Sequence, residues 1–186
     1  MAEQPLKIAV AGAGSIGCYV GGMLRADGHE VTFIGRPAIA ERFARDGLHV
    51  QSMSGEKKDI DAPDLDFSLL PNGASDASHV LVCVKSMATR EIAKALKPHL
   101  AENATVISLQ NGLDNATVLQ TVLTDQAVCA GMVSFNVVQQ NGNRFIATTE
   151  GGIHLQRSDA TAKMNEALKA ADIDCQLHDD MTAVLW

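Results

Sequence analysis

The chain has 186 residues, 46% of them hydrophobic, which is enough for one domain of ordinary size, or one domain and a fragment of another, with a substantial core. Charged residues make up 20% and the formal net charge is −7, which argues against an extended nucleic-acid surface, so any phosphate site has to be built locally. The first residues lack a basic segment followed by an apolar one, and no run of about 18 apolar residues occurs. These features favour a soluble, cytoplasmic protein that has no membrane partner.

Cysteine and histidine residues are scattered along the chain rather than paired. The 4 cysteines form no CxxC motif and mostly lie within apolar stretches, which is typical of reduced thiols in a core. The 6 histidines contain no close pair with metal-ligand spacing. We therefore expect no metal site.

An apolar run leads straight into a glycine-rich turn near the start of the chain. Residues 6–11 have the pattern of a strand, and the GxGxxG motif that follows opens a helix pattern. Gly12 permits the tight turn, Gly14 lets a pyrophosphate approach the backbone, and Gly17 lets the helix lie close to the strand. The free N–H groups of the helix face the phosphates. The residues expected to bind a dinucleotide here are Gly12, Ala13, Gly14, Ser15, Ile16 and Gly17.

The first helix is expected to end at Asp27-Gly28, after apolar residues at helical spacing. Gly21-Gly22 lies inside it and costs about 1 kcal/mol per glycine relative to alanine. This pair indicates close backbone packing, unless the chain simply tolerates a weak helix. A β-branched and aromatic strand at 31–34 and a helix through Arg45 complete a β-α-β unit.

The remaining pattern alternates between strands and helices. The expected elements are a hairpin or two short strands within 47–61, strands at 79–84, 105–109, 127–131, 144–148 and 153–155, and helices at 88–97, after Gly112 and at 161–171. This alternation predicts an α/β fold with a Rossmann-like, doubly wound, mainly parallel sheet and antiparallel additions near its later edge.

Candidate binding residues follow the strands, because ligands of open α/β sheets lie outside the carboxyl ends of the strands. Arg36 stands about 20 residues after the glycine turn, where an NAD enzyme usually has an acidic residue. A guanidinium binds a 2′-phosphate bidentately, so this position favours NADP(H) over NAD(H). The alternative is that Arg36 is a solvated turn residue.

Lys85 and Asn111 follow two further strands. An ammonium group at Lys85 would hold a substrate carboxylate or polarise a carbonyl. The amide of Asn111 would donate to a carbonyl and accept from a hydroxyl. In the alternative interpretations, Lys85 is a surface residue at the start of a helix and Asn111-Gly112 is an ordinary turn pair.

In their order and spacing, these motifs resemble the N-terminal domain of ketopantoate reductase, also called 2-dehydropantoate 2-reductase. The matching segments are the turn from Gly12 to Gly17, Arg36, the strand into Lys85-Ser86, Leu109-Gln110-Asn111-Gly112-Leu113, Gly131-Met132-Val133-Ser134 and Ala183-Val184-Leu185-Trp186. They span nearly the whole chain.

The resemblance implies NADPH-dependent reduction of 2-dehydropantoate, a small 2-oxo acid, to pantoate, on the way to pantothenate and coenzyme A. It places Lys85 and Asn111 in the pocket for substrate and nicotinamide and Arg36 at the 2′-phosphate. In the family, a general-acid lysine follows the tryptophan that matches Trp186, on a helix that opens a helical C-terminal domain. We therefore expect residues 1–180 to form the dinucleotide-binding domain and 181–186 to begin a helical domain that this chain lacks, so that the chain alone has little or no turnover.

Other functions remain open from the sequence. One is a reductase that acts on another branched 2-oxo acid. Another is a module that senses NADP redox state without catalysis, although cofactor binding alone would not require Lys85 and Asn111. A third is a structural Rossmann-like domain with an empty nucleotide site. The oligomeric state is not predicted.

Overall fold

The structure, a computed structural model, describes residues 4–112 and 114–185. The strands are β1 (Lys7–Ala11), β2 (Glu30–Ile34), β3 (Leu48–Gln51), β4 (Lys57–Ile60), β5 (Asp66–Ser68), β6 (His79–Val82), β7 (Thr105–Ser108), β8 (Ala127–Val133), β9 (Val137–Gln140), β10 (Arg144–Ala147), β11 (Ile153–Gln156) and β12 (Cys175–His178). The α-helices are α1 (Ser15–Ala26), α2 (Pro37–Asp46), α3 (Thr89–Leu96), α4 (Asn115–Val122), α5 (Asp159–Ala170) and α6 (Thr182–Leu185). Short 3₁₀ helices are η1 (Ala62–Asp64), η2 (Pro71–Ala74), η3 (Ser86–Ala88) and η4 (Lys97–His99).

The main sheet of the described residues has eight strands in the order β12-β11-β8-β7-β6-β1-β2-β5. The strands from β8 through to β5 are parallel to their neighbours, whereas β11 runs antiparallel to β8 and parallel to β12. The predicted mainly parallel sheet with antiparallel additions at its later edge is confirmed. The carboxyl ends of β1, β2, β6 and β7 therefore meet at one edge, where ligands of such sheets bind.

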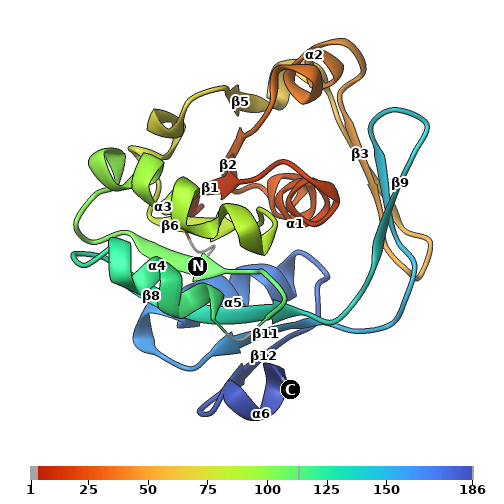
Figure 1. Cartoon of the computed structure of the whole chain (residues 1–186). Helices are drawn as coiled ribbons and strands as arrows, with labels where there is room; N and C mark the ends of the chain where they lie inside the picture. Colours follow the sequence, from red (N-terminus) through yellow and green to blue (C-terminus); the bar gives the residue numbers. More distant parts are fainter. Residues whose placement is uncertain (1–3, 113, 186) are drawn as a thin grey trace.

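Helices cover both faces of this sheet, as the doubly wound prediction requires (Figure 1). On one face, Val10, Phe33 and Leu81 belong to a core that also contains buried residues of α1, α2 and α5. On the other face, Val80 and Val106 share a smaller core with residues of α3 and α4. The near-continuous apolar character of β6 and β7 follows from this burial on both sides.

Close packing explains the glycine pair in α1. A Cβ atom at Gly21 would lie 2.5 Å from the ring of Phe33 in β2, and one at Gly22 would lie 2.7 Å from Val50 in β3. The close packing expected at Gly21-Gly22 is present, as an approach of the α1 backbone to side chains of β2 and β3, and α1 lies between the two sheets (Figure 1).

A second sheet, which the sequence interpretation did not separate from the first, has the order β4-β3-β10-β9 within the described residues. The hairpin expected within 47–61 is present as antiparallel β3 and β4, but β3 pairs with β10 rather than with the main sheet. Strand β9, also missed, forms a hairpin with β10 through Asn141-Gly142, where both residues have positive φ. Asn-Gly between two strands is a strong hairpin signal, so this turn was readable from the sequence.

Other differences concern short elements and boundaries. The edge strands β5 and β12 were not predicted; β5 has only three residues, too few for a pattern. The strand expected at 79–84 ends at Val82, where the chain turns toward Lys85. Helix α5 begins at Asp159, two residues before the predicted start, because Ser158 caps it and exchanges hydrogen bonds with Thr161 in a capping box. Leu113 and Trp186, both part of the segments matched to the family, lie outside the described residues.

Burial of His79 makes stability depend on pH. Desolvation at the start of β6 lowers the pKa of His79, and the neighbouring charges of Lys163 and His29 lower it further, against one backbone hydrogen bond that raises it. The unfolded chain therefore binds a proton at His79 more readily than the folded chain does. The contribution of neutral His79 to the free energy of unfolding is fully present above the unfolded pKa of about 6.5 and is lost as pH falls below it.

We expect His79→Asn to reduce the pH dependence of urea unfolding between about pH 7 and pH 5. A residual slope should remain, because burial and the adjacent His178 also lower the pKa of His154. His99→Asn, in the exposed η4 segment, is the control. An unchanged slope in His79→Asn would refute the assignment.

Candidate active site

The glycine turn that follows β1 is held against the end of β2. Gly12 has φ +114°, which an L side chain rarely adopts, and a Cβ there would lie 2.8 Å from the backbone nitrogen of Val84. The backbone N–H groups of Gly12 and Ala13 both donate to the carbonyl of Ile34, at 3.0 and 3.2 Å. The turn therefore touches the ends of both neighbouring strands, β2 and β6.

The N-terminus of α1 has no side-chain cap. The first N–H groups of the helix therefore stay available to a ligand. Nothing lies within 4 Å of the position that a Cβ at Gly14 would take, which leaves room for a group to approach the backbone. At Gly17, by contrast, a Cβ would collide with the carbonyl oxygen of Gly12. The three glycines therefore have different surroundings, in the pattern expected of a glycine turn that binds pyrophosphate.

Arg36 lies beside this turn, at the start of α2. It is the N-cap residue of α2, two positions after Ile34, whose carbonyl holds the glycine turn. Gly35, just before it, allows the end of β2 to lie against the glycine turn, because a Cβ at Gly35 would lie 2.8 Å from Cβ of Ala13. Arg36 is exposed and has no ion-pair or hydrogen-bond partner for its side chain among the described residues. An exposed guanidinium without a partner among the described residues therefore follows the strand that holds the glycine turn.

Lys85 and Asn111 line one cavity of about 440 Å³ at the carboxyl edge of the main sheet. Ile16 from the start of α1 reaches the same cavity, which joins it to the glycine turn. The two turns are linked directly, since Ser86 Oγ donates to the carbonyl of Asn111 at 3.2 Å. The structure thus brings Ile16, Lys85 and Asn111 together, while Arg36 lies at the neighbouring strand end outside this cavity.

Residues after β8 complete the cavity and were not expected there. Phe135 and Asn136 line it together with Val133 and Val137. The strand-end rule that selected Lys85 and Asn111 applies equally to β8, which ends at Val133. Extending that rule by one strand would have found Phe135 and Asn136.

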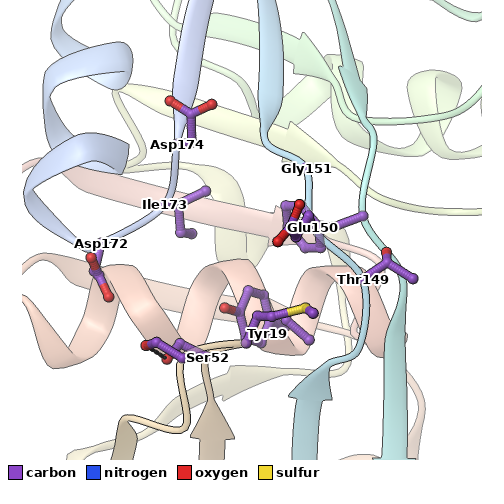
Figure 2. Close-up of a pocket in the computed structure, with 12 residues that line it drawn as sticks. Tyr19, Ser52, Thr149, Glu150, Gly151, Asp172, Ile173 and Asp174 are labelled. Carbon is purple, nitrogen blue, oxygen red and sulfur yellow. Dashed lines mark hydrogen bonds between the residues drawn. The ribbon is translucent and has the colours of Figure 1, made fainter.

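A different cavity, of about 340 Å³, lies between α1 and the two sheets (Figure 2). Its lining includes the carboxylates of Glu150, Asp172 and Asp174, and it contains none of the predicted site residues. Negative groups would repel a phosphate or a carboxylate. The cavity that contains Lys85 and Asn111 is therefore the better candidate for an anionic ligand.

The cysteine near the candidate site is a neutral thiol. Burial raises the pKa of Cys83 to about 12, and burial likewise raises the pKa values of Cys18 and Cys175. All four cysteines are free. Since the thiolate is the reactive form of cysteine, Cys83, which lines the cavity, is not expected to act as a nucleophile. Within residues 4–112 and 114–185, no group of three or more His, Cys, Asp or Glu side chains is arranged to hold a metal ion.

Comparison with known proteins identifies the family. The sequence model described as "Ketopantoate reductase PanE/ApbA" matches residues 8–160. The chain belongs to the ketopantoate reductase family. A solved member, the PanE/ApbA family ketopantoate reductase from Ralstonia eutropha JMP134, is 33% identical with a TM-score of 0.89, and the match covers 97% of this chain and 59% of that one.

Sequence relatives of this ketopantoate reductase family chain include proteins with different names. The 2-dehydropantoate 2-reductase of Halobacterium salinarum is 35% identical over 127 residues, which are 68% of this chain and 41% of the relative. A glycerol-3-phosphate dehydrogenase [NAD(P)+] of Rhizobium johnstonii is 28% identical over 168 residues, 89% of this chain and 49% of the relative. The chain thus spans roughly half the length of these relatives. Among its described residues, no helix is long and apolar enough to cross a membrane.

Proposed function

We propose that this chain is the cofactor-binding part of an NADPH-dependent oxidoreductase that reduces 2-dehydropantoate to pantoate in the cytoplasm. Membership of the ketopantoate reductase family supports the reaction class. The observation that carries the proposal is the cavity in which Lys85 and Asn111 meet next to the glycine turn. A site that only bound nucleotide would not need this polar pair at its substrate edge.

The residues present fit a dinucleotide. Its pyrophosphate would lie at Gly12 to Gly17, against the uncapped end of α1, where Gly14 leaves open space. Arg36 would hold the 2′-phosphate of NADPH, because its guanidinium is unpaired among the described residues and the residue before it, Gly35, packs against Ala13 of the glycine turn. The nicotinamide end would extend toward Ile16, Lys85 and Asn111. When bound, the reduced nicotinamide supplies a hydride for the ketone.

The chain's own residues orient the 2-oxo acid and stabilise charge. The Lys85 ammonium would attract the substrate carboxylate and the developing negative charge on the ketone oxygen. The Asn111 amide would donate to the substrate or to a nicotinamide carbonyl and accept from a hydroxyl. A proton must also reach the alkoxide oxygen. By family resemblance, that proton comes from a lysine on a helical domain.

We further propose that residues 1–180 are the dinucleotide-binding domain, that 181–186 lead toward that helical domain, and that the 186-residue polypeptide alone turns over slowly. The match to the Ralstonia eutropha protein covers 59% of that chain, so a large part of the related structure has no counterpart in this sequence. A steady-state assay with NADPH and 2-dehydropantoate tests this proposal. Catalytic efficiency typical of an enzyme, at about 10⁴ M⁻¹s⁻¹ or above, would refute the proposed slow turnover.

Arg36→Ala is expected to weaken NADPH binding by about tenfold and to leave NADH binding unchanged, because only NADPH carries the phosphate that this exposed guanidinium would contact. Isothermal titration with both cofactors measures the two affinities. Arg42→Ala, on the same helix, is the matched control. If the ratio of NADPH to NADH affinity is the same in Arg36→Ala and in the parent, the assignment of NADP is wrong.

Two alternatives keep the same cofactor site. A reductase of another branched 2-oxo acid would oxidise NADPH with that acid faster than with 2-dehydropantoate. An NADP-sensing module would bind NADPH but show no single-turnover oxidation with any 2-oxo acid. A panel of 2-oxo acids under single-turnover conditions distinguishes both from the proposed function.

A further inference from the structure

A network of neutral polar side chains is buried beneath Lys85 and Asn111. Thr89, Gln110 and Asn115 are only 1%, 4% and 6% exposed, and Ser108 is 1% exposed. They come from α3, from the end of β7 and from the first residue of α4. Burying such groups costs free energy unless each one is hydrogen-bonded, so the arrangement of their bonds is informative.

Gln110 connects the end of β7 to the end of β6. Its Nε2 donates to the carbonyl of Val84 at 2.8 Å and to Oγ1 of Thr89 at 2.7 Å. Its Oε1 accepts from Oγ of Ser108 at 3.2 Å. The amide of Gln110 is therefore satisfied at both ends, and one of its bonds fixes the residue that precedes Lys85.

Asn115 makes the corresponding connection from the opposite side. Its Nδ2 donates to the carbonyl of Asn111 at 3.0 Å and to Oγ of Ser86 at 3.2 Å. Ser86 Oγ in turn donates to the same Asn111 carbonyl. These bonds fix the residue that follows Lys85 and the backbone of Asn111 itself.

Thr89 joins the two halves. Its Oγ1 accepts from Gln110, and it lies 3.0 Å from Oδ1 of Asn115 and 2.9 Å from the carbonyl of Ser86, to either of which it can donate its single proton. Removing this hydroxyl would take one acceptor from Gln110 and the donor that Asn115 Oδ1 and the Ser86 carbonyl share. Thr89 is therefore the residue on which the connection between the two turns depends.

We propose that Thr89, Gln110 and Asn115 are positioning residues, which fix the spacing between the Lys85 turn and the Asn111 turn and thereby the seat of the nicotinamide. The part that concerns nicotinamide rests on the proposed function. The part that concerns the two turns rests on the hydrogen bonds alone. The network ends on the backbone of Val84 and Asn111 and on the side chain of Ser86, directly beside the two candidate site residues, which indicates a role in the site.

The test compares Thr89→Val, which keeps the side-chain shape and removes the hydroxyl, with Thr89→Ser, which keeps the hydroxyl. We expect Thr89→Val to weaken NADPH binding by about tenfold, the usual effect of leaving buried polar groups without partners. Binding of adenosine 2′,5′-bisphosphate should not change, because this fragment lacks the nicotinamide end. Thr89→Ser should bind NADPH as the parent does. Thr121→Val, where an exposed hydroxyl donates to Val118 within α4, is the matched control.

Amide hydrogen exchange tests the two turns without any cofactor. The amide of Ala88 donates to the Lys85 carbonyl at 2.8 Å and reports on that turn, whereas the amide of Cys83 donates to Ala11 at 2.9 Å and reports on the sheet. Thr89→Val should accelerate exchange at Ala88 by about tenfold relative to Cys83, because local opening becomes easier.

The outcomes separate this proposal from the proposed function. Equal losses of affinity for NADPH and adenosine 2′,5′-bisphosphate, or unchanged exchange at Ala88, overturn the positioning role. If the parent chain binds no NADPH, the proposed function fails, and exchange at Ala88 alone decides whether the network holds the turns.

Discussion

The Gly17→Ala variant is expected to lose about 3 kcal/mol of stability, which lowers the melting temperature of a chain of this size by roughly 6–12 °C. A Cβ at Gly17 would collide with the carbonyl oxygen of Gly12 and would lie 2.9 Å from Cγ1 of Val10. The first of these atoms is backbone, so no side-chain rotation relieves the contact. The loss should appear even though alanine is favoured over glycine in a helix interior by about 1 kcal/mol.

Gly14→Ala is the matched comparison, because nothing lies within 4 Å of its added Cβ. The backbone at Gly14 has φ −88°, which alanine adopts easily, so stability should change by less than about 1 kcal/mol. The new methyl group would occupy the space through which a pyrophosphate approaches. NADPH binding should therefore weaken by at least about tenfold in a protein that remains fully folded.

Thermal unfolding measures the stability of both variants, and isothermal titration measures their affinity for NADPH. The expected pattern is one variant that is unstable and one that is stable but binds poorly. A Gly17→Ala protein as stable as the parent would mean that α1 can move away from β1. A Gly14→Ala protein with unchanged NADPH affinity would mean that the phosphates do not approach this backbone.

The main sheet was predictable because its pattern is local. The apolar runs around Val10, Leu81 and Ile107 are buried on both faces, and each is followed by turn residues and a helix. The second sheet was not predictable in the same way. Strand β3 pairs with β10, nearly 100 residues later, and no short-range pattern encodes that choice of partner. For the β9–β10 hairpin, the short-range signal in the sequence is the Asn141-Gly142 turn.

The candidate site was predictable to the extent that topology determines it. Parallel strands place Arg36, Lys85 and Asn111 at one edge once each is known to follow a strand. The buried network beneath them was not predictable, because Thr89 and Asn115 are ordinary residues in helix patterns until α3 and α4 pack side by side. Phe135 and Asn136 were missed for a simpler reason, since the strand-end rule was not extended to β8.

Replacing Lys85 by methionine is expected to slow single-turnover oxidation of NADPH by 2-dehydropantoate by about 100-fold. Methionine keeps a long apolar side chain and removes the ammonium group, which is the donor proposed to meet the charge that develops on the ketone oxygen. Loss of one such donor typically costs a factor of about 10² to 10³ in rate. Single-turnover measurement, by absorbance at 340 nm with excess enzyme, detects this change even when steady-state turnover is slow.

Stability should not change in this variant, because Lys85 is exposed and has no ion-pair partner among the described residues. Lys94→Met, at an exposed position of α3 away from the cavity, controls for the loss of one positive charge. If the charge matters only through the general field of the molecule, both variants slow the reaction equally. If Lys85 meets the reacting oxygen, only Lys85→Met slows the reaction at saturating NADPH. A Lys85→Met rate within about threefold of the parent, well short of the effect of a lost donor, would remove Lys85 from the proposed reaction.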